Sequence, residues 1–278
     1  MSDPRLIDEI VPFADNGLYG LLTRRSKDPV SGPVLVLLNP GVIPRSGPFR
    51  LHVRLARRLA KAGIATFRFD LPGIGDATPD TTVTRMQAVT MALDAVQRHT
   101  GVNTFVMGGL CLGADLAWKA ALQDPRIVGM LQIDGFARID YWYYQAWAKD
   151  HFRWPPVRAL AAIARLAIRR LRPVEEFGRE WPARGEERVQ LRAMLDRGVK
   201  VFALYTGGIA AYFRDPRQFA STYANAADDP QMRFEFWPDC DHVFFAESDR
   251  VRLIDAVSTW YESAFHCSRP VERLRVSA

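Results

Sequence analysis

The amino-acid sequence predicts an α/β protein built on a doubly wound, mostly parallel β-sheet. Apolar runs of strand length alternate along the chain with segments of helical periodicity, which is the pattern of such a sheet. Several of these runs, such as 33–38, are apolar throughout, as expected for a strand that is buried on both faces. The length of 278 residues fits one large domain that carries an insertion.

The expected elements follow one another in a regular order. Short apolar alternations at 10–25 predict a β-hairpin, and Gly63 is expected to stop a helix whose periodicity begins at residue 49. An apolar run that starts at Phe105 turns sharply through glycines and continues as a helical segment. The expected strands are 33–38, 65–70, the run from Phe105, 127–133, 200–205 and 233–236, and the main expected helices are 49–62, 82–98 and 249–265.

Residues 140–196 interrupt this alternation and are expected to form a helical cap over the strand ends, with 1–139 and 197–278 as the core. The insertion is rich in aromatic residues at its start and continues as a basic amphipathic helix over 157–171. The aromatic side chains are expected to pack the cap onto the sheet, and some of them could line an apolar pocket. The arginine-rich helix is expected to face solvent rather than a membrane surface.

The composition argues against several classes of function. A net charge of +6 and a pI near 9.4 would allow contact with nucleic acid, but the arginines are dispersed and no nucleic-acid-binding motif accompanies them. The cysteines Cys111, Cys240 and Cys267 are odd in number and lack metal-ligand spacing, so neither a disulfide framework nor a metal site is expected. Without an apolar signal core or a membrane-spanning run, we expect a cytoplasmic protein with no transmembrane segment.

The strand-to-helix turn at 109–113 carries the candidate nucleophile. Its sequence, Gly-Leu-Cys-Leu-Gly, fits the nucleophile elbow pattern Gly-x-nucleophile-x-Gly, with Cys111 where serine usually stands. Such a turn holds the nucleophile in a strained backbone conformation, and it needs small residues at 109 and 113 because a Cβ there would clash with the neighbouring strand and helix. The following helix points its N-terminus at the thiol, which favours the thiolate.

Together with this turn, three further stretches resemble the α/β-hydrolase family, and the resemblance covers nearly the whole chain. These stretches are Asn39-Pro40-Gly41, Arg68-Phe69-Asp70-Leu71-Pro72-Gly73-Ile74-Gly75-Asp76 and Asp241-His242-Val243-Phe244. Within the family, the Gly-Leu-Cys elbow is similar to that of bacterial hydrolases associated with exosortase and exopolysaccharide systems. Dienelactone hydrolases and polyhydroxyalkanoate synthases also place cysteine at this elbow, so the resemblance implies either hydrolysis or acyl transfer. No cofactor is expected, because the glycines at 73 and 75 lack the spacing of a dinucleotide-binding motif.

The resemblance also implies the other catalytic groups. His242 follows the last expected strand, where this fold returns its histidine to the nucleophile, and it is expected to act as general base and then as general acid. The oxyanion hole is expected to use the backbone N–H of Leu112, just after the nucleophile, and a second N–H from the loop after the first buried strand. Pro40 has no N–H, so Gly41 or Val42 must donate, and Val42 is favoured.

The carboxylate of the expected triad has two candidates. Family members usually place it a few residues past the strand that ends near Tyr205, but there the chain reads Thr-Gly-Gly-Ile-Ala and has no carboxylate before Asp215. Asp215 could reach back if its loop folds over the sheet. Asp134 lies at the tip of the preceding strand, a position that some lipases of this fold use, and it is slightly favoured. A pair of Cys111 and His242 without an acid is the third alternative, because a thiol ionises more readily than an alcohol.

Three functions are compatible with these residues. The first is cofactor-independent hydrolysis of an ester or thioester through a covalent acyl-cysteine. The second is acyl transfer or thioester processing in a biosynthetic pathway, because a thioester is well suited to aminolysis and acyl exchange. The third is a non-catalytic binding module on the same scaffold, which only the missing carboxylate after residue 208 supports. For the first two, the expected partner is a small acyl ester or thioester, free or linked to a carrier, and the aromatic insertion suggests an apolar acyl group.

Overall fold

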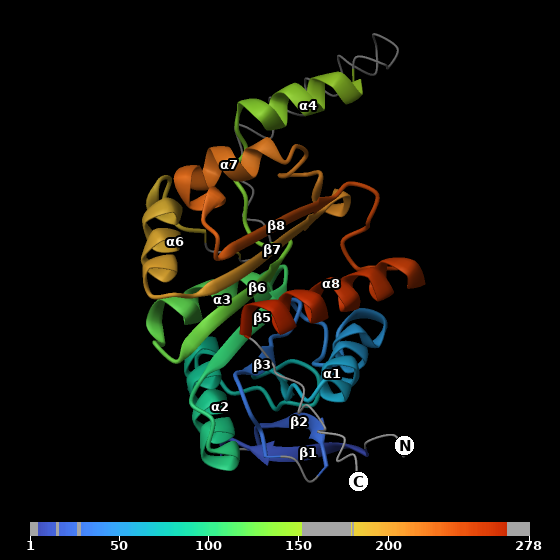
Figure 1. Ribbon diagram of the computed structural model, residues 1–278, viewed down its shortest axis with the longest axis vertical. Helices are drawn as coiled ribbons and strands as arrows, with labels where there is room; N and C mark the ends of the chain where they lie inside the picture. The colour runs from blue at the N-terminus through green and yellow to red at the C-terminus, as the bar shows by residue number, and fades with distance from the viewer. Residues whose placement is uncertain (1–4, 15–16, 27–28, 152–178, 180, 266–278) are drawn as a thin grey trace, which may run out of the picture.

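The computed structural model (Figure 1) describes residues 5–14, 17–26, 29–151, 179 and 181–265. In these ranges eight strands form one sheet in the order β1-β2-β4-β3-β5-β6-β7-β8. β1 pairs antiparallel with β2, β2 pairs antiparallel with β4, and all other pairings are parallel, which confirms the predicted fold class. The strands are β1 (Leu6–Pro12), β2 (Tyr19–Arg25), β3 (Val34–Leu37), β4 (Thr66–Phe69), β5 (Phe105–Leu110), β6 (Ile127–Ile133), β7 (Lys200–Thr206) and β8 (Met232–Trp237).

Helices cover both faces of the sheet, which explains why its central strands are apolar throughout. On β3, Val34 and Val36 point into the larger of two cores, whereas Leu35 and Leu37 point into the smaller core on the opposite face. The larger core is covered by α2 (Arg85–Thr100), α3 (Leu112–Gln123) and α6 (Glu186–Asp196), and the smaller core by α1 (Leu51–Lys61) and α8 (Glu247–Phe265). The continuous apolar runs of the sequence therefore mark strands that lie between two helical layers.

The helix that the periodicity predicted from residue 49 begins two residues later. The preceding residues form the short 3₁₀ helix η1 (Pro48–Arg50), in which Phe49 and Arg50 have φ angles of 48° and 61°. Positive φ angles are unfavourable for residues with a Cβ and interrupt the regular helix, so α1 starts at Leu51. The same turn leaves the ring of Phe49 about half exposed.

The insertion between β6 and β7 is described in part. It opens with α4 (Tyr141–His151), and the amphipathic helix predicted over 157–171 lies outside the described residues. Near its end, α6 packs beside α3 and contributes to the larger core through Leu191, Met194 and Leu195. A separate cap with limits at 140 and 196 stays a prediction.

The remaining short helices lie between β7 and β8. They are η2 (Gly207–Ile209), α7 (Arg217–Tyr223) and η3 (Ala224–Asp228). Figure 1 shows α7 beside β8 at one end of the molecule, with α4 beyond it. Within the described ranges, every helix is too short or too polar to cross a bilayer.

Candidate active site

Cys111 lies at the sharp turn between β5 and α3. Its backbone angles are φ 57° and ψ −119°, a conformation that is strained for any residue with a Cβ. The turn can close because glycines flank it. A Cβ on Gly109 would lie 2.3 Å from the carbonyl carbon of Gly113, and a Cβ on Gly113 would lie 2.8 Å from the carbonyl oxygen of Asn39. The thiol is free and the residue is half-buried, so this turn has the geometry of a nucleophile elbow.

The loop after β3 lies against the start of α3. A Cβ on Gly41, whose φ is 63°, would lie 3.6 Å from Cδ1 of Leu112. Leu112 is the first residue of α3, and the first N–H groups of a helix have no acceptor within the helix. The loop therefore brings Gly41 and Val42 next to the residue that follows Cys111. The use of Leu112 with Val42 or Gly41 as oxyanion donors stays a prediction.

Buried polar contacts hold this loop. Nδ2 of Asn39 donates to Oδ1 of Asp70 at 2.9 Å, and Oδ1 of Asn39 accepts the N–H of Leu71 at 2.8 Å. The N–H of Arg45 donates to Oδ1 of Asp70 at 2.6 Å, and its guanidinium pairs with both Asp70 and Asp76. Asp70 is almost fully buried. These carboxylates therefore fix the loop that borders the nucleophile.

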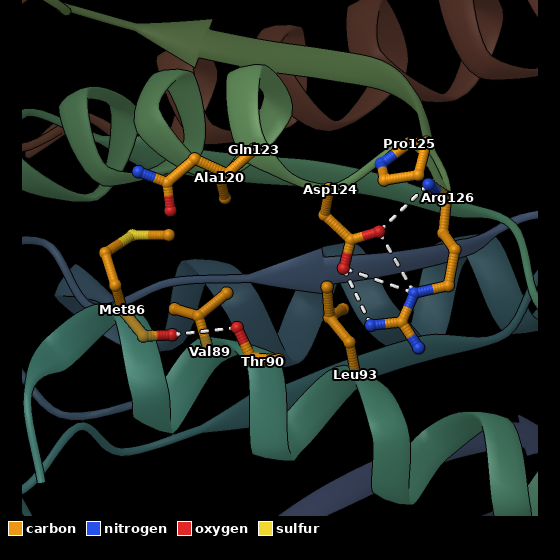
Figure 2. Close-up of a pocket in the computed structure, with 9 residues that line it drawn as sticks. All are labelled: Met86, Val89, Thr90, Leu93, Ala120, Gln123, Asp124, Pro125 and Arg126. Atoms are coloured by element: carbon orange, nitrogen blue, oxygen red, sulfur yellow. Dashed lines mark hydrogen bonds and ion pairs between the residues drawn. The ribbon is translucent and has the colours of Figure 1, made fainter.

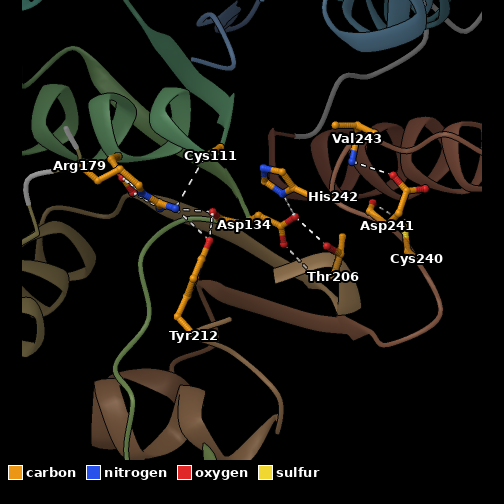
Figure 3. A network of polar contacts seen from close by, with 10 residues as sticks. Cys111, Asp134, Arg179, Thr206, Tyr212, Cys240, Asp241, His242 and Val243 are labelled. Carbon is orange, nitrogen blue, oxygen red and sulfur yellow. Dashed lines mark hydrogen bonds and ion pairs between the residues drawn. The ribbon is translucent and has the colours of Figure 1, made fainter. Parts of the chain in front are cut away.

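His242 reaches the site on the loop after β8. Gly207 and Gly208 at the end of β7 let this loop approach the sheet, because a Cβ on Gly208 would lie only 2.1 Å from the backbone nitrogen of His242. Nδ1 of His242 donates to Oδ2 of Asp134 at 2.7 Å (Figure 3). Burial acts to lower the pKa of His242, but hydrogen bonds with Asp134 and Cys111 outweigh it and raise the pKa to about 9. The hydrogen bond to the buried carboxylate of Asp134 therefore fixes the imidazole at the site, and its raised pKa favours the imidazolium near neutral pH.

Asp134 is fully buried at the end of β6. Its φ of 50° is a conformation that aspartate tolerates better than most residues do. Oδ1 accepts the N–H of Thr206 and Oδ2 accepts the hydroxyl of Thr206, both at 2.7 Å. With the bond from His242, three donors hold this carboxylate in one orientation.

The structure does not bring Asp215, the other candidate acid, to His242. Oδ2 of Asp215 pairs with the guanidinium of Arg217 at 2.6 Å, and Oδ1 accepts the N–H of Arg217 at 2.9 Å. The hydrogen bond from Arg217 lowers the pKa of Asp215. Asp215 thus bonds to the first turn of α7 instead of folding back over the sheet, and Asp134 is the candidate that contacts the imidazole.

Sequence reasoning missed a charged group that contacts the nucleophile. Nη1 of Arg179 lies 3.8 Å from Sγ of Cys111 and 2.9 Å from the hydroxyl of Tyr212. No local pattern marks Arg179, since its position depends on contacts with distant elements. Thr206 was also missed, although a signal existed: it directly follows the strand predicted over 200–205, at the sheet edge where the acid was expected.

Exposed apolar side chains lie on the loops that carry the candidate site. Val42 on the loop after β3 is 87% exposed, and Phe245, three residues beyond the histidine, is 69% exposed. The rings of Phe49 and Phe245 meet edge to face with centroids 5.5 Å apart. We refer to Val42, Phe49, Val243 and Phe245 as the apolar rim. The two phenylalanine rings therefore bring the loop after β3 and the histidine loop into contact at the edge of the candidate site.

A separate pocket lies between α2 and α3 (Figure 2). Apolar side chains such as Met86 and Leu93 line it, and the guanidinium of Arg126 pairs with Asp124 at 2.7 Å at its edge. Its lining includes none of the candidate catalytic residues. Among the described residues, no group of three or more His, Cys, Asp or Glu side chains could hold a metal ion.

The sheet order, the strained residue between β5 and α3 and the histidine returned after the last strand define a class of protein, the α/β hydrolases. In agreement with this, residues 35–256 match the alpha/beta hydrolase family, and the chain belongs to that family. No curated protein sequence matches the chain. The narrower resemblance to hydrolases of exosortase and exopolysaccharide systems stays a prediction.

Solved structures with the same fold have low sequence identity to this chain. An esterase from Pyrococcus furiosus has a TM-score of 0.59 and 12% identity, with 94% of this chain and 91% of the esterase covered. A dienelactone hydrolase from Anabaena variabilis has a TM-score of 0.55 and 14% identity, with 94% and 98% covered. An esterase from Thermogutta terrifontis has a TM-score of 0.53 and 20% identity, with 94% and 99% covered. At these identities the likeness shows the fold alone.

Proposed function

We propose that this protein hydrolyses an ester or thioester through a covalent acyl-cysteine on Cys111. The observation that carries the proposal is a free thiol at a strained turn, next to an imidazole that is hydrogen-bonded to a buried carboxylate. A nucleophile, a base and an orienting carboxylate are the parts that nucleophilic catalysis needs. The structurally similar proteins include two esterases and a dienelactone hydrolase, which agrees with acyl chemistry.

Acylation begins from a thiolate on Cys111 paired with protonated His242. The sulfur attacks the carbonyl carbon, and the carbonyl oxygen becomes an oxyanion that accepts hydrogen bonds from the N–H of Leu112 and from Val42 or Gly41. When the tetrahedral intermediate collapses, the bond to the alcohol or thiol breaks and His242 gives that leaving group its proton. The carbonyl forms again as part of an acyl thioester on Cys111.

Deacylation runs the same groups in the opposite direction. His242, now neutral, takes a proton from a water molecule while the water oxygen attacks the thioester carbonyl. The second tetrahedral intermediate expels the thiolate of Cys111 and releases the carboxylic acid. Asp134 holds the ring so that Nε2 faces the reacting atoms during both steps.

The apolar rim supports an acyl group with apolar character as the substrate. Its members lie on the loop after β3, on η1 and on the loop that carries His242, so a bound acyl chain would extend from the reacting carbonyl over these side chains. The substrate class that fits is a small acyl ester or thioester, free or linked to a carrier.

Initial rates with acetyl, butyryl and octanoyl esters and thioesters test the proposal. We expect Cys111→Ala to lose at least about 10³-fold in kcat/KM, because the bond-forming atom is removed. Cys267→Ala, which removes another cysteine, serves as the matched control and is expected to keep the wild-type rate. Normal turnover by Cys111→Ala would refute the proposal.

Acyl transfer is the second candidate, and the sulfur nucleophile favours it. A thioester passes its acyl group to amines and thiols more readily than an oxygen ester does, so an acyl-cysteine can serve a transferase as well as a hydrolase. Adding amine, thiol or alcohol acceptors to the enzyme with an acyl thioester separates the two. Product release that is faster with an acceptor than with water alone, together with an acylated acceptor, indicates transfer.

Only the missing carboxylate after residue 208 favoured a non-catalytic binding module. Asp134 contacts His242 from the neighbouring strand, so a carboxylate is available to the imidazole without one at that position. Failure of acyl electrophiles to label Cys111 above the background of the other cysteines would restore this third hypothesis.

A further inference from the structure

The guanidinium of Arg179 lies beside the candidate nucleophile. Its Nη1 is 3.8 Å from Sγ of Cys111, within the range of a hydrogen bond to sulfur. Only 4% of the Arg179 side chain is exposed, so this charge is shielded from solvent. In Figure 3 the guanidinium and the imidazole of His242 approach Cys111 from different sides.

Arg179 is held in one position by several acceptors. Nε donates to Oδ2 of Asp115 at 2.6 Å and Nη2 donates to Oδ1 of Asp115 at 2.9 Å, a bidentate ion pair. Nη1 also donates to the hydroxyl of Tyr212 at 2.9 Å, and Tyr212 in turn donates to the carbonyl oxygen of Asp134 at 3.0 Å. Burial acts to lower the pKa of Arg179, but Asp115 outweighs it and raises the pKa, so the guanidinium stays charged.

Asp115 connects this charge to the nucleophile through a single helix. It lies four residues after Cys111 on α3, one helical turn away, and its side chain is nearly buried. Asp115 also accepts the N–H of Phe136 at 3.1 Å, which fixes its carboxylate against the loop after β6. The position of the guanidinium relative to the sulfur is therefore set by the first turn of α3, which directly follows Cys111.

A guanidinium can only donate hydrogen bonds, and a neutral thiol is a weak acceptor whereas a thiolate is a strong one. We propose that Arg179 is a catalytic residue that stabilises the thiolate of Cys111, with Asp115 as the residue that positions it. This inference rests on the proposed function of Cys111. In acylation Arg179 stabilises the attacking sulfur anion, and in deacylation it stabilises the same anion as it leaves the tetrahedral intermediate. No proton passes to Arg179 in either step.

Other charged and polar groups surround the site. Arg179 lies 3.8 Å from the sulfur, and Asp134, Asp115 and Tyr212 bind His242 and Arg179 from the end of β6, from α3 and from the segment after η2. The imidazolium and the guanidinium are the cations of this set, so each of them favours the thiolate. Without the guanidinium, the imidazolium of His242 is the one cation of these groups that is left to stabilise the thiolate.

The rate of Cys111 labelling by iodoacetamide as a function of pH tests the inference without any substrate. In Arg179→Gln we expect the labelling profile to move to higher pH by about one unit, so that labelling near pH 6 becomes about tenfold slower. Arg179→Lys keeps a positive charge and is expected to retain most of the wild-type profile. A folded Arg179→Gln variant with the wild-type profile would show that Arg179 is only structural and would overturn the inference.

Arg138→Gln is the matched control. Arg138 pairs with Glu187 at 3.0 Å and bonds to the carbonyl oxygen of Pro182, so its loss also removes a partly buried arginine pair between the insertion and the core. It does not contact the sulfur, and its labelling profile is expected to match that of the wild type. Circular dichroism and thermal unfolding of all variants separate loss of folding from loss of thiolate.

A second measurement applies if Arg179→Gln does not fold. In His242→Gln the guanidinium remains, and we expect Cys111 to label with a lower pH midpoint than in the protein unfolded with guanidinium chloride. A midpoint equal to or above that of the unfolded protein would contradict the inference. The proposed function fails separately, through normal turnover by Cys111→Ala, whatever the labelling profile of the arginine variants.

Discussion

Asp134→Asn is the sharpest perturbation of the candidate site. Asparagine keeps the size of the side chain and tolerates the positive φ at residue 134, while it removes the charge. With Oδ1 retained by the N–H of Thr206, the amide NH₂ of the variant faces Nδ1 of His242 and donates to it. The ring then carries its proton on Nε2, which is the wrong tautomer for accepting a proton from water or thiol.

The size of the expected effect follows from the pKa of His242. The site raises this pKa from 6.5 to about 9. At about 1.4 kcal/mol per unit, the imidazolium is stabilised by on the order of 3 kcal/mol, which corresponds to roughly 300-fold, and Asp134 shares this effect with Cys111. We therefore expect kcat/KM at neutral pH to fall about 100-fold in Asp134→Asn. The alkaline limit of the wild-type rate profile should lie near pH 9 and should move towards 6.5 in the variant.

The same pair affects stability with a definite sign. The pKa of His242 in the folded protein is above its unfolded value of 6.5. The contribution of His242 to the free energy of unfolding is therefore fully present below pH 6.5 and is lost as the pH rises through about 9. The free energy of unfolding of the wild type should therefore fall across this window, and the fall should be smaller in Asp134→Asn.

Steady-state rates on an acyl ester across this pH range, with denaturant unfolding at its two ends, measure both effects. Asp215→Asn is the matched control, since its carboxylate pairs with Arg217, and we expect it to keep the wild-type rate and pH limit. An Asp134→Asn enzyme with wild-type kcat/KM and an unmoved alkaline limit would refute the assignment of Asp134 as the acid.

Two further substitutions probe the loops around the site. Gly208→Ala places a Cβ 2.1 Å from the backbone nitrogen of His242, so the loop that carries His242 must shift. We expect kcat/KM to fall at least about tenfold, and an unchanged rate would show that this close approach is not needed. Phe49→Ser with Phe245→Ser should raise KM for octanoyl esters about tenfold and leave acetyl esters unchanged, because apolar contact with the longer chain is lost. Val189→Ser, an exposed apolar position on α6, is its control, and equal effects on both ester lengths would contradict the role of the apolar rim.

The features that could be predicted from the sequence are those with a local cause. The apolar runs identified the parallel strands because burial on both faces requires apolar residues at every position, as Val34 to Leu37 illustrate. The elbow was recognisable because Gly109 and Gly113 are required by close backbone contacts within a few residues of Cys111 and with the strand beside it. Helix starts were less accurate, since the positive φ angles of Phe49 and Arg50 delay α1 and neither residue type signals such a conformation.

The features that could not be predicted depend on contacts between distant parts of the chain. Asp134 and His242 are 108 residues apart, and the choice between Asp134 and Asp215 depended on whether the segment after η2 folds back or continues into α7. Arg179 is 64 residues from Asp115 and 68 from Cys111, and no spacing or motif links them. Such pairs are defined by the assembled sheet edge, where the ends of parallel strands and their loops meet.

Peptide mass spectrometry of enzyme quenched in acid, shortly after mixing with an octanoyl ester, tests the acyl-cysteine most directly. We predict the mass of one octanoyl group on the peptide that contains Cys111, with the adduct lost as product accumulates. Steady turnover without an acyl group on that peptide, or with the acyl group on a different residue, would contradict the assignment of Cys111 as nucleophile.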